Sequence, residues 1–245
     1  MSQSSSWYRS WFNTPYYHIL YKDRDDREAR FFIQNLVNRL APSAQSCLLD
    51  LACGRGRHAR FLNELGHRVT GIDLSESSIE YAQQFTNANL HFEVGDMREP
   101  FGEQRFDFIF NLFTSFGYFK NKEDNIAALR CIKKALKPDG TFVFDFMNVH
   151  QVQLGLVKEE VRVIEGIEFH ITRLIRDEHV IKKISFSDKG QDFEFEESVQ
   201  LLTLAHFEEL FAAAGLCIRS IHGDFELGDF DAVKSDRLIL MTGVK

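Results

Sequence analysis

The chain has no closely spaced cysteines, no long apolar run and no concentrated patch of basic residues. Its four cysteines, Cys47, Cys53, Cys131 and Cys217, form no C-x-x-C pair, which predicts a reduced cytoplasmic protein without structural zinc. No apolar stretch approaches about 18 residues and no basic-then-apolar segment stands at the N-terminus, so neither membrane insertion nor secretion is expected. Because the net charge is -7 and lysines and arginines gather on no face, nucleic acid is a disfavoured substrate.

The composition otherwise fits a globular protein of one domain, or one domain with an elaboration. The 245 residues are 44% hydrophobic and 27% charged, which is enough for a sizeable core. The 24 phenylalanines are the unusual feature, and they occur in loops as well as in strands. They indicate either a pocket with aromatic walls or a phenylalanine-rich core, and the sequence leaves both open.

The stretch from Cys47 to Asp73 organises the rest of the chain. The apolar run CLLDLA predicts a buried parallel strand, and Gly54 and Gly56 predict a turn in which the backbone runs close to a ligand. A helix is expected from Arg57 to a stop at Gly66, followed by a second strand that Asp73 closes. The free amides at the start of that helix favour an anionic part of the ligand. This is a nucleotide-binding βαβ unit.

Two cofactor classes use this unit, and the sequence favours one. Gly54 to Ala59 formally satisfies the G-x-G-x-x-G/A dinucleotide pattern, with Asp73 placed for a ribose hydroxyl, which allows NAD. Asp50, however, lies inside the strand just before the turn, where its charge repels a pyrophosphate and attracts an ammonium group and a cationic sulfur. The order of Asp50, Gly54 and Gly56 therefore favours a sulfonium cofactor. Cys53 is either a small turn filler or a reactive thiol.

The segments after Asp73 alternate between strand and helix. Strands are expected at Leu90 to Val94, Phe106 to Asn111 and Thr141 to Met147, with helices between them and a turn at residues 137–140. A helix cap is expected at Ser75, or at Ser77 in a capping box with Glu80. This order predicts a doubly wound, mostly parallel Rossmann-like α/β sheet whose ligand lies beyond the strand ends. The polar residues at or near those ends are Asp73, Asp96, Asn111 and Asp145.

Two segments depart from this order. Residues 157–202 contain four stretches of alternating pattern with turns at residues 177–178 and 188–190, which predicts a small inserted antiparallel sheet on the acceptor or oligomer side. Residues 203–245 return to a helix and two last strands, while residues 23–156 form the cofactor-binding core. Residues 1–22 precede the core, and the first six of them, mostly serine, are expected to be disordered.

The segment from Trp7 to Tyr21 is densely aromatic and is called the aromatic lid below. Exposed aromatic side chains at this density must fold back on the protein, so the segment covers either the cofactor cleft or a sheet edge. Over the cleft, Tyr16, Tyr17 and Tyr21 are the candidates for a cation–π contact with the sulfonium. An amphipathic helix is then expected from Asp23 to Leu40.

Under the sulfonium interpretation the strand-end acids have separate roles. Asp73 would accept the ribose hydroxyls, Asp96 the adenine amino group with Met97 against the ring, and Asp50 the methionine ammonium, directly or through water. The backbone amides around Gly54 to Gly56 would receive the carboxylate of the cofactor's methionine part. The full set of expected cofactor-binding residues is Asp50, Ala52, Cys53, Gly54, Gly56, His58, Asp73, Leu74, Asp96, Met97, Asn111, Phe113, Tyr16 and Tyr21. No metal ligands are expected.

Five segments resemble successive motifs of class I S-adenosylmethionine (SAM) dependent methyltransferases. They are LLDLACGRGRH, GIDLSESSIEYA, GDMREPF, FDFIFNLFTSFGYF and ALKPDGTFVFDF, and Ala52 stands where many members have glycine. The likeness is strongest to the sugar N,N-dimethyltransferases of nucleotide-linked amino sugars, and more distant to glycine N-methyltransferases. It implies that Tyr118 and Tyr16 or Tyr17 face the acceptor, with Tyr118 and Tyr17 as candidate catalytic residues. A histidine often occupies the position of Tyr118.

Three functions follow. The first is a SAM-dependent methyltransferase acting on nitrogen or oxygen of a metabolite or amino sugar, as a monomer or homodimer. The second is a non-catalytic SAM-binding protein that engages a partner, and the third is an NAD-dependent oxidoreductase. Because a sulfonium methyl group is already activated, the first needs mainly alignment of donor and acceptor, which supplies about 7 to 11 kcal/mol. Tyr118, His18 or His150 could assist as a base.

Overall fold

The computed structural model describes residues 7–22 and 26–245. The expectation of disorder at residues 1–6 and the predicted helix start at Asp23 lie outside these residues. No helix in the described ranges is long and apolar enough to cross a membrane. The helices are α1 (Trp7–Phe12), α2 (Pro15–Leu20), α3 (Asp26–Leu40), α4 (Arg57–Glu64), α5 (Glu76–Gln83), α6 (Lys122–Ala135), α7 (Val149–Leu154) and α8 (Leu204–Ala214).

Seven strands form a mostly parallel central sheet. They are β1 (Cys47–Leu51), β2 (Arg68–Asp73), β3 (Leu90–Val94), β4 (Phe106–Asn111), β5 (Leu136–Met147), β10 (Leu216–His222) and β11 (Arg237–Val244). Their order is β10-β11-β5-β4-β1-β2-β3, and β11 runs antiparallel to both of its neighbours. The direction of winding reverses at β1 and β4, so the turn after β1 opens at a switch point, where open α/β sheets bind ligands. The predicted fold class is confirmed.

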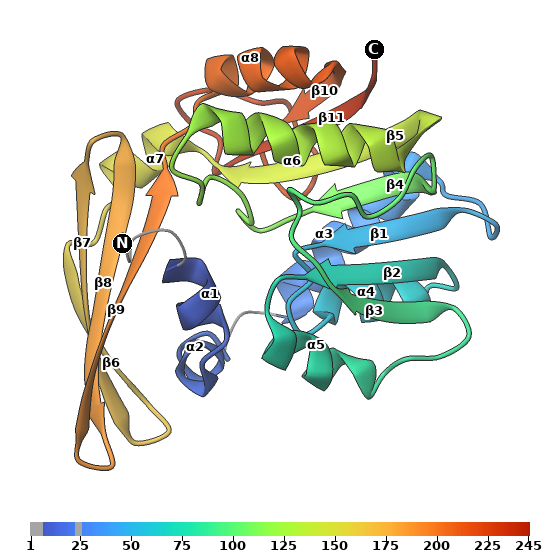
Figure 1. Cartoon of the computed structure of the whole chain (residues 1–245). Helices are drawn as coiled ribbons and strands as arrows, with labels where there is room; N and C mark the ends of the chain where they lie inside the picture. The colour runs from blue at the N-terminus through green and yellow to red at the C-terminus, as the bar shows by residue number, and fades with distance from the viewer. Residues whose placement is uncertain (1–6, 23–25) are drawn as a thin grey trace.

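Helices cover both faces of this sheet (Figure 1). One apolar cluster joins the buried faces of α6 and α8 to β4 and β5, and many of its members are phenylalanines. A second cluster joins α3, α4 and α5 to the opposite face. The largest fully buried side chains include Phe106, Phe110, Phe142, Phe144 and Phe146, all on central strands. Much of the unusual phenylalanine content therefore forms core.

Four further strands form a separate antiparallel sheet, called the inserted sheet below. They are β6 (Glu159–Ile164), β7 (Ile167–Arg176), β8 (His179–Asp188) and β9 (Gln191–Gln200), paired in chain order. The predicted turn residues Asp177 and Glu178 both have positive φ, as does Lys189 before Gly190, which is typical of tight hairpin turns. The prediction of an inserted antiparallel sheet is confirmed.

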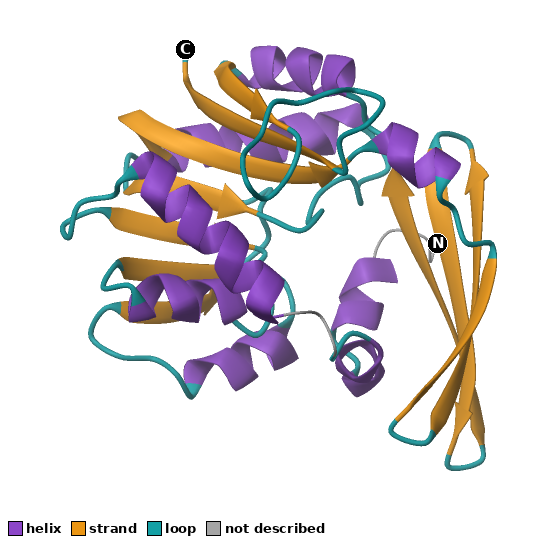
Figure 2. Ribbon diagram, turned by 180° about the vertical axis from the view of Figure 1, so that it is seen from behind, coloured by secondary structure: helices purple, strands orange, loops and turns teal. Residues whose placement is uncertain are grey.

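The aromatic lid lies between the inserted sheet and the central sheet. Figures 1 and 2 show α1 and α2 in this position from opposite sides of the molecule. One face of the inserted sheet packs on the lid in a third apolar cluster, to which Trp11 and Leu20 contribute fully buried side chains. The lid is therefore attached to the inserted sheet and faces the strand ends of the core.

Candidate active site

A cavity of about 450 Å³ lies between the aromatic lid, the strand ends of the core and β9. Most of the predicted site residues line it. They are Ala52, Cys53, Gly54, His58, Asp73, Leu74, Asp96, Met97, Phe113, Tyr17, Tyr21 and Tyr118. Its volume falls within the range of small-molecule sites, about 300 to 1,000 Å³. Asp50, Gly56, Asn111 and Tyr16, which were also predicted, are not among the lining residues.

Gly54 and Gly56 have different structural roles in the turn. Gly54 has φ +54°, and a Cβ added there would meet no protein atom within 4 Å, so its outer side is open to the cavity. Gly56 has φ +79°, and a Cβ there would lie 2.5 Å from the ring of Phe92. Gly54 thus permits the approach of a ligand, whereas Gly56 permits packing of the turn against the core. Ala52 also adopts a positive φ, +62°, which the turn imposes on a non-glycine residue.

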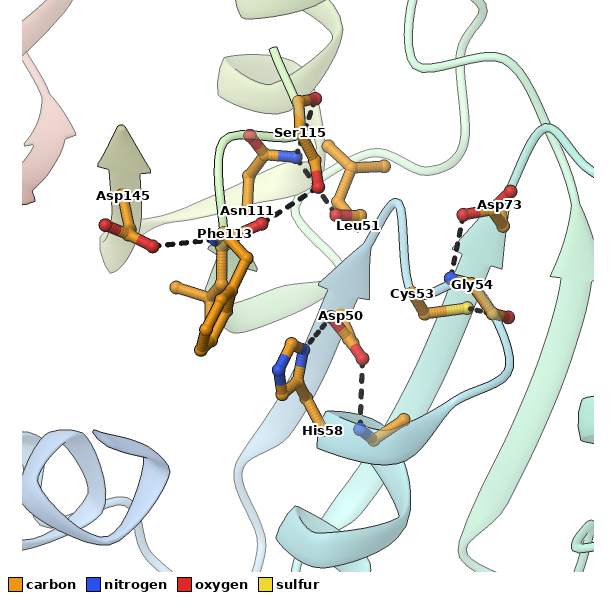
Figure 3. Close-up of polar contacts among 12 residues, drawn as sticks. Asp50, Leu51, Cys53, Gly54, His58, Asp73, Asn111, Phe113, Ser115 and Asp145 are labelled. Carbon is orange, nitrogen blue, oxygen red and sulfur yellow. Dashed lines mark hydrogen bonds and ion pairs between the residues drawn. The ribbon is translucent and has the colours of Figure 1, made fainter. Parts of the chain in front are cut away.

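Asp73 ties this turn to the end of β2. Its carboxylate accepts the backbone amide of Gly54 at 2.8 Å (Figure 3). It also accepts the amide of Ser75 at 2.8 Å. Burial raises the pKa of Asp73, and these backbone hydrogen bonds oppose the rise. Since a carboxylate has about four lone-pair sites, these amides leave room for a ligand hydroxyl. This geometry suits the predicted ribose contact.

Asp50 lies behind the turn instead of in the cavity. Its side chain is buried, accepts the amide of Ala59 at the start of α4 at 3.0 Å, and lies 3.9 Å from Nδ1 of His58 (Figure 3). Burial raises its pKa to about 7, against the Ala59 hydrogen bond and with a further contribution from the charge of Asp73. Its influence on a ligand therefore passes through the turn or a water molecule.

Asp96 is engaged by two arginines that the sequence interpretation missed. Oδ1 accepts both the backbone amide and Nε of Arg98 at 3.0 Å, and Oδ2 accepts the Arg98 guanidinium at 2.7 Å and that of Arg9 at 3.4 Å. Burial raises the pKa of Asp96, but the Arg98 hydrogen bonds outweigh it and hold the pKa below its ordinary value. These four contacts occupy the roughly four lone-pair sites of a carboxylate. An adenine amino group would have to share or displace one of them.

A strained loop after β4 forms another wall. Phe113 and Thr114 have φ of +57° and +61°, and Asp145, at the end of β5, accepts the amide of Phe113 at 2.6 Å (Figure 3). Arg237 donates to Asp145 at 2.8 Å and to the hydroxyl of Thr114 at 3.0 Å. The amide of the fully buried Asn111 donates to the carbonyl of Leu51, so it supports the turn after β1 from below. Asp145 and Asn111 thus shape the cavity without lining it.

Aromatic side chains of the lid surround Tyr118. The rings of Trp7 and Phe12 meet it edge-on, with centroids at 5.5 and 5.7 Å, and that of Tyr8 stacks at 6.4 Å. The Tyr118 hydroxyl donates to the carbonyl of Thr114 at 2.6 Å. Trp7, Tyr8 and Phe12 of the lid therefore line the cavity, and the lid also packs on the inserted sheet.

Tyr16 is the member of the lid that the structure places elsewhere. Its hydroxyl donates to Asp188 on β8 at 2.9 Å, and its ring packs against Phe186 and Phe193 of the inserted sheet. Helical spacing turns Tyr16 away from the face that carries Tyr17 and Tyr21 to the cavity. The choice that the sequence left between Tyr16 and Tyr17 falls on Tyr17.

Glu197 of β9 brings a carboxylate to the cavity wall that the sequence analysis did not assign. It accepts Nε1 of Trp11 at 2.7 Å and the hydroxyl of Tyr21 at 2.7 Å, and Lys182 lies 3.8 Å away. Lys182 also contacts the Tyr21 hydroxyl and lies over its ring. The alternation of β9 places Glu197 on the inner face beside Phe195 and Val199, and that period was the signal available in the sequence.

Comparison with known proteins agrees with this geometry. Residues 48–140 match the family described as "Methyltransferase domain". The chain is 31% identical to the dTDP-3-amino-3,4,6-trideoxy-alpha-D-glucopyranose N,N-dimethyltransferase of Streptomyces venezuelae, over 78% of this chain and 83% of that protein. It is 28% identical to the dTDP-3-amino-3,6-dideoxy-alpha-D-glucopyranose N,N-dimethyltransferase of Streptomyces fradiae, over 82% of each.

A solved structure extends the likeness to the whole fold. The S-adenosylmethionine-dependent methyltransferase of Clostridium acetobutylicum superimposes with a TM-score of 0.78 at 18% identity, over 94% of this chain and 96% of that one. The open side of Gly54 and the spare lone pairs of Asp73 fit the cofactor of such enzymes. The chain belongs to the class I S-adenosylmethionine-dependent methyltransferases.

Proposed function

We propose that this enzyme transfers the methyl group of SAM to an amine nitrogen of a small amino sugar or a similar metabolite. The observation that carries the proposal is the 31% identity to an amino-sugar N,N-dimethyltransferase over 83% of that protein's length. The cavity supports it, because Glu197 provides a carboxylate on the acceptor side and the lid provides aromatic walls. Both features favour an acceptor with a cationic or polar nitrogen on an otherwise compact ring.

The cofactor would be held by the turn and by the ends of β2 and β3. Asp73 would accept its ribose hydroxyls, and Leu74 and Met97 would pack on its adenine. The amide of Gly54 already donates to Asp73 and that of Gly56 to the carbonyl of Cys53, so Arg55 carries the turn amide proposed to receive the cofactor carboxylate. Asp96 reaches the adenine amino group if Arg9 gives up its contact, the longest of the four at 3.4 Å. Ala52, Cys53, His58 and Phe113 line the same part of the cavity.

When bound, SAM supplies an electrophilic methyl group on a cationic sulfur. The protein's own residues then have to orient the acceptor and exclude water. Tyr17, Tyr21 and Tyr118 line the acceptor side, and Asp145 holds the loop that ends at Tyr118. An amine of pKa about 10 costs about 4 kcal/mol to deprotonate at pH 7. Because the Tyr118 hydroxyl donates its own proton to the carbonyl of Thr114, Tyr118 would act as a base only in its phenolate form.

A screen with isotope-labelled SAM tests the proposal. Amino sugars, free and nucleotide-linked, are compared with matched sugars that carry a hydroxyl in place of the amine, and labelled product is measured by mass spectrometry. The proposal expects label only on the amines. Labelling of the hydroxyl compounds alone, or of none of the acceptors while SAM binds, would contradict it.

Four expectations from the sequence remain proposals. They are a cytoplasmic location, a monomeric or homodimeric state, the absence of a nucleic-acid or membrane partner, and the division of the chain at residues 1–22, 23–156, 157–202 and 203–245. The inserted sheet supports the third segment, residues 157–202, since β6 begins at Glu159 and β9 ends at Gln200.

A further inference from the structure

The aromatic lid is attached to its two neighbours in different ways. Its apolar side packs on the inserted sheet, and Glu197 and Asp188 accept hydrogen bonds from Trp11 and Tyr16. Its contacts with the core lie at the cavity and beside it. They are the aromatic contacts with Tyr118 and Phe119 and the polar contacts with the loops after β2 and β3. The lid and the inserted sheet therefore form one unit that meets the core around the ligand.

Asn13, between α1 and α2, makes the densest of these polar contacts. Its Oδ1 lies 2.9 Å from Oγ of Ser75 and 3.1 Å from Oγ of Ser77, and it accepts the backbone amide of Ser77 at 3.2 Å. The carbonyls of Phe12 and Asn13 lie 3.2 and 3.3 Å from the same two hydroxyls. Ser75 is also the N-cap of α5, so Asn13 adds a second capping group from a distant part of the chain.

The same serine contacts Asp73, the residue proposed to bind the ribose of the cofactor. The amide of Ser75 donates to Asp73 at 2.8 Å, while its hydroxyl contacts Asn13. A short chain of hydrogen bonds thus runs from Asp73 through Ser75 to the lid, and from the lid through Trp11 to Glu197 at the acceptor side. The loop after β2 is therefore linked by hydrogen bonds, through the lid, to the wall on the acceptor side.

We propose that Asn13 is a positioning residue that couples cofactor binding at Asp73 to closure of the aromatic lid and the inserted sheet over the acceptor. The proposal rests on the cofactor site described above. With the loop after β2 ordered by the ribose, Ser75 and Ser77 present their donors to Asn13 and the lid is held closed. With that loop loosened, the lid loses its capping contact and keeps the aromatic contacts and the contact of Arg9 with Asp96.

The chemistry of the contact provides a conservative variant. Because Oδ1 of Asn13 acts as the acceptor, Asn13→Asp keeps the contact and places a negative charge at the start of α5, where it is favourable. Asn13→Ala removes it. Ser10→Ala is a matched control, since Ser10 is an exposed lid residue whose hydroxyl donates to the carbonyl of Trp7 in its own helix.

The test combines calorimetry with hydrogen exchange. SAM affinity is measured by titration, and amide exchange of residues 7–22 is followed by mass spectrometry with and without saturating SAM. In the wild type, Ser10→Ala and Asn13→Asp, SAM should slow exchange of the lid. In Asn13→Ala, SAM should bind about tenfold more weakly and leave lid exchange unchanged at saturation.

Three results would overturn the proposal. One is lid protection in Asn13→Ala equal to that in Ser10→Ala, and another is an Asn13→Asp variant that behaves like Asn13→Ala. The third is a wild type that binds SAM without any protection of the lid. A wild type that fails to bind SAM would instead refute the cofactor site itself, so the two failures are distinguishable.

Discussion

Asp73 accepts the backbone amide of Gly54 at 2.8 Å, and this hydrogen bond joins the ends of two adjacent parallel strands at the edge of the cavity. The same carboxylate accepts the amide of Ser75, so one side chain fixes both the turn after β1 and the loop after β2. The glycine turn is thereby held with the outer side of Gly54 open. The predictions below follow from this arrangement.

Gly54→Ala and Gly56→Ala should separate binding from stability. Gly54→Ala places a methyl group in the open cavity, so SAM affinity should fall more than about tenfold, while the left-handed backbone costs only about 1 to 2 kcal/mol of stability. Gly56→Ala drives a methyl group into Phe92 and should lower stability by about 1 to 3 kcal/mol more than that strain. Calorimetric titration and thermal unfolding measure the two effects. If the two variants lost the same SAM affinity and did not differ in stability, the separate roles given to Gly54 and Gly56 would be contradicted.

Asp50 should make both stability and SAM binding depend on pH. Its pKa is about 7 in the folded protein, whereas its ordinary value, taken for the unfolded chain, is 3.8. Between these two pH values the folded state therefore binds more protons than the unfolded state. The free energy of unfolding should therefore decrease as the pH rises from about 4 to about 7. Asp50→Asn should remove this component of the decrease, as measured by urea unfolding across that range.

The same group predicts proton release on binding. A cationic ligand beside the turn favours the ionised carboxylate, so SAM binding near pH 7 should release a fraction of a proton and tighten with rising pH. Titrations in buffers of different ionisation enthalpy measure this release. Wild type and Asp50→Asn releasing the same number of protons would show that Asp50 does not sense the ligand.

Arg237→Met should destabilise the protein through Asp145. Asp145 is fully buried and its ion pair with Arg237 spans 2.8 Å, so removing the arginine leaves an uncompensated charge and should cost about 3 kcal/mol. Lys137→Met is the control, because its pair with Asp107 is more exposed and should cost about 0 to 1 kcal/mol. Urea unfolding compares them, and similar losses in the two variants would contradict the role given to Asp145.

Glu197→Gln tests the acceptor side. The glutamine keeps an oxygen for Trp11 and Tyr21 but removes the charge, so KM for an amine acceptor should rise about tenfold with little change in SAM affinity. Glu196→Gln is the matched control, since Glu196 is the adjacent residue and its side chain is exposed on the other face of β9. Steady-state kinetics with an amino-sugar acceptor measure the difference, and equal KM values in the two variants would rule out a role for the Glu197 charge.

The order of strands and the turn could be predicted because they depend on local patterns. Apolar runs, glycine spacing and strand-end acids gave β1 to β4 within about one residue and placed Asp73 in the cavity. One local expectation was wrong, because residues 137–140 continue β5, which begins at Leu136, instead of forming a turn. Of the two capping residues expected for α5, the structure has Ser75. The short helix α7 was not predicted.

The rest depends on contacts between segments far apart in the chain. Nothing in the sequence near Asp96 shows that Arg9 reaches it across 87 positions, or that Tyr16 bonds to Asp188. Asp50 was placed beside the ligand from strand spacing alone, whereas its register with β2 and β4 buries it behind the turn. Such placements follow from how the lid and the inserted sheet pack, which no local period encodes.

The most direct test is a calorimetric titration of the wild type and Asp73→Ala with SAM, its demethylated product and NAD. The account predicts one SAM or product molecule bound per chain, a loss of about 1.5 to 3 kcal/mol of binding free energy in Asp73→Ala, and no binding of NAD. Binding of NAD without SAM or its product, or unchanged SAM affinity in a folded Asp73→Ala variant, would contradict it.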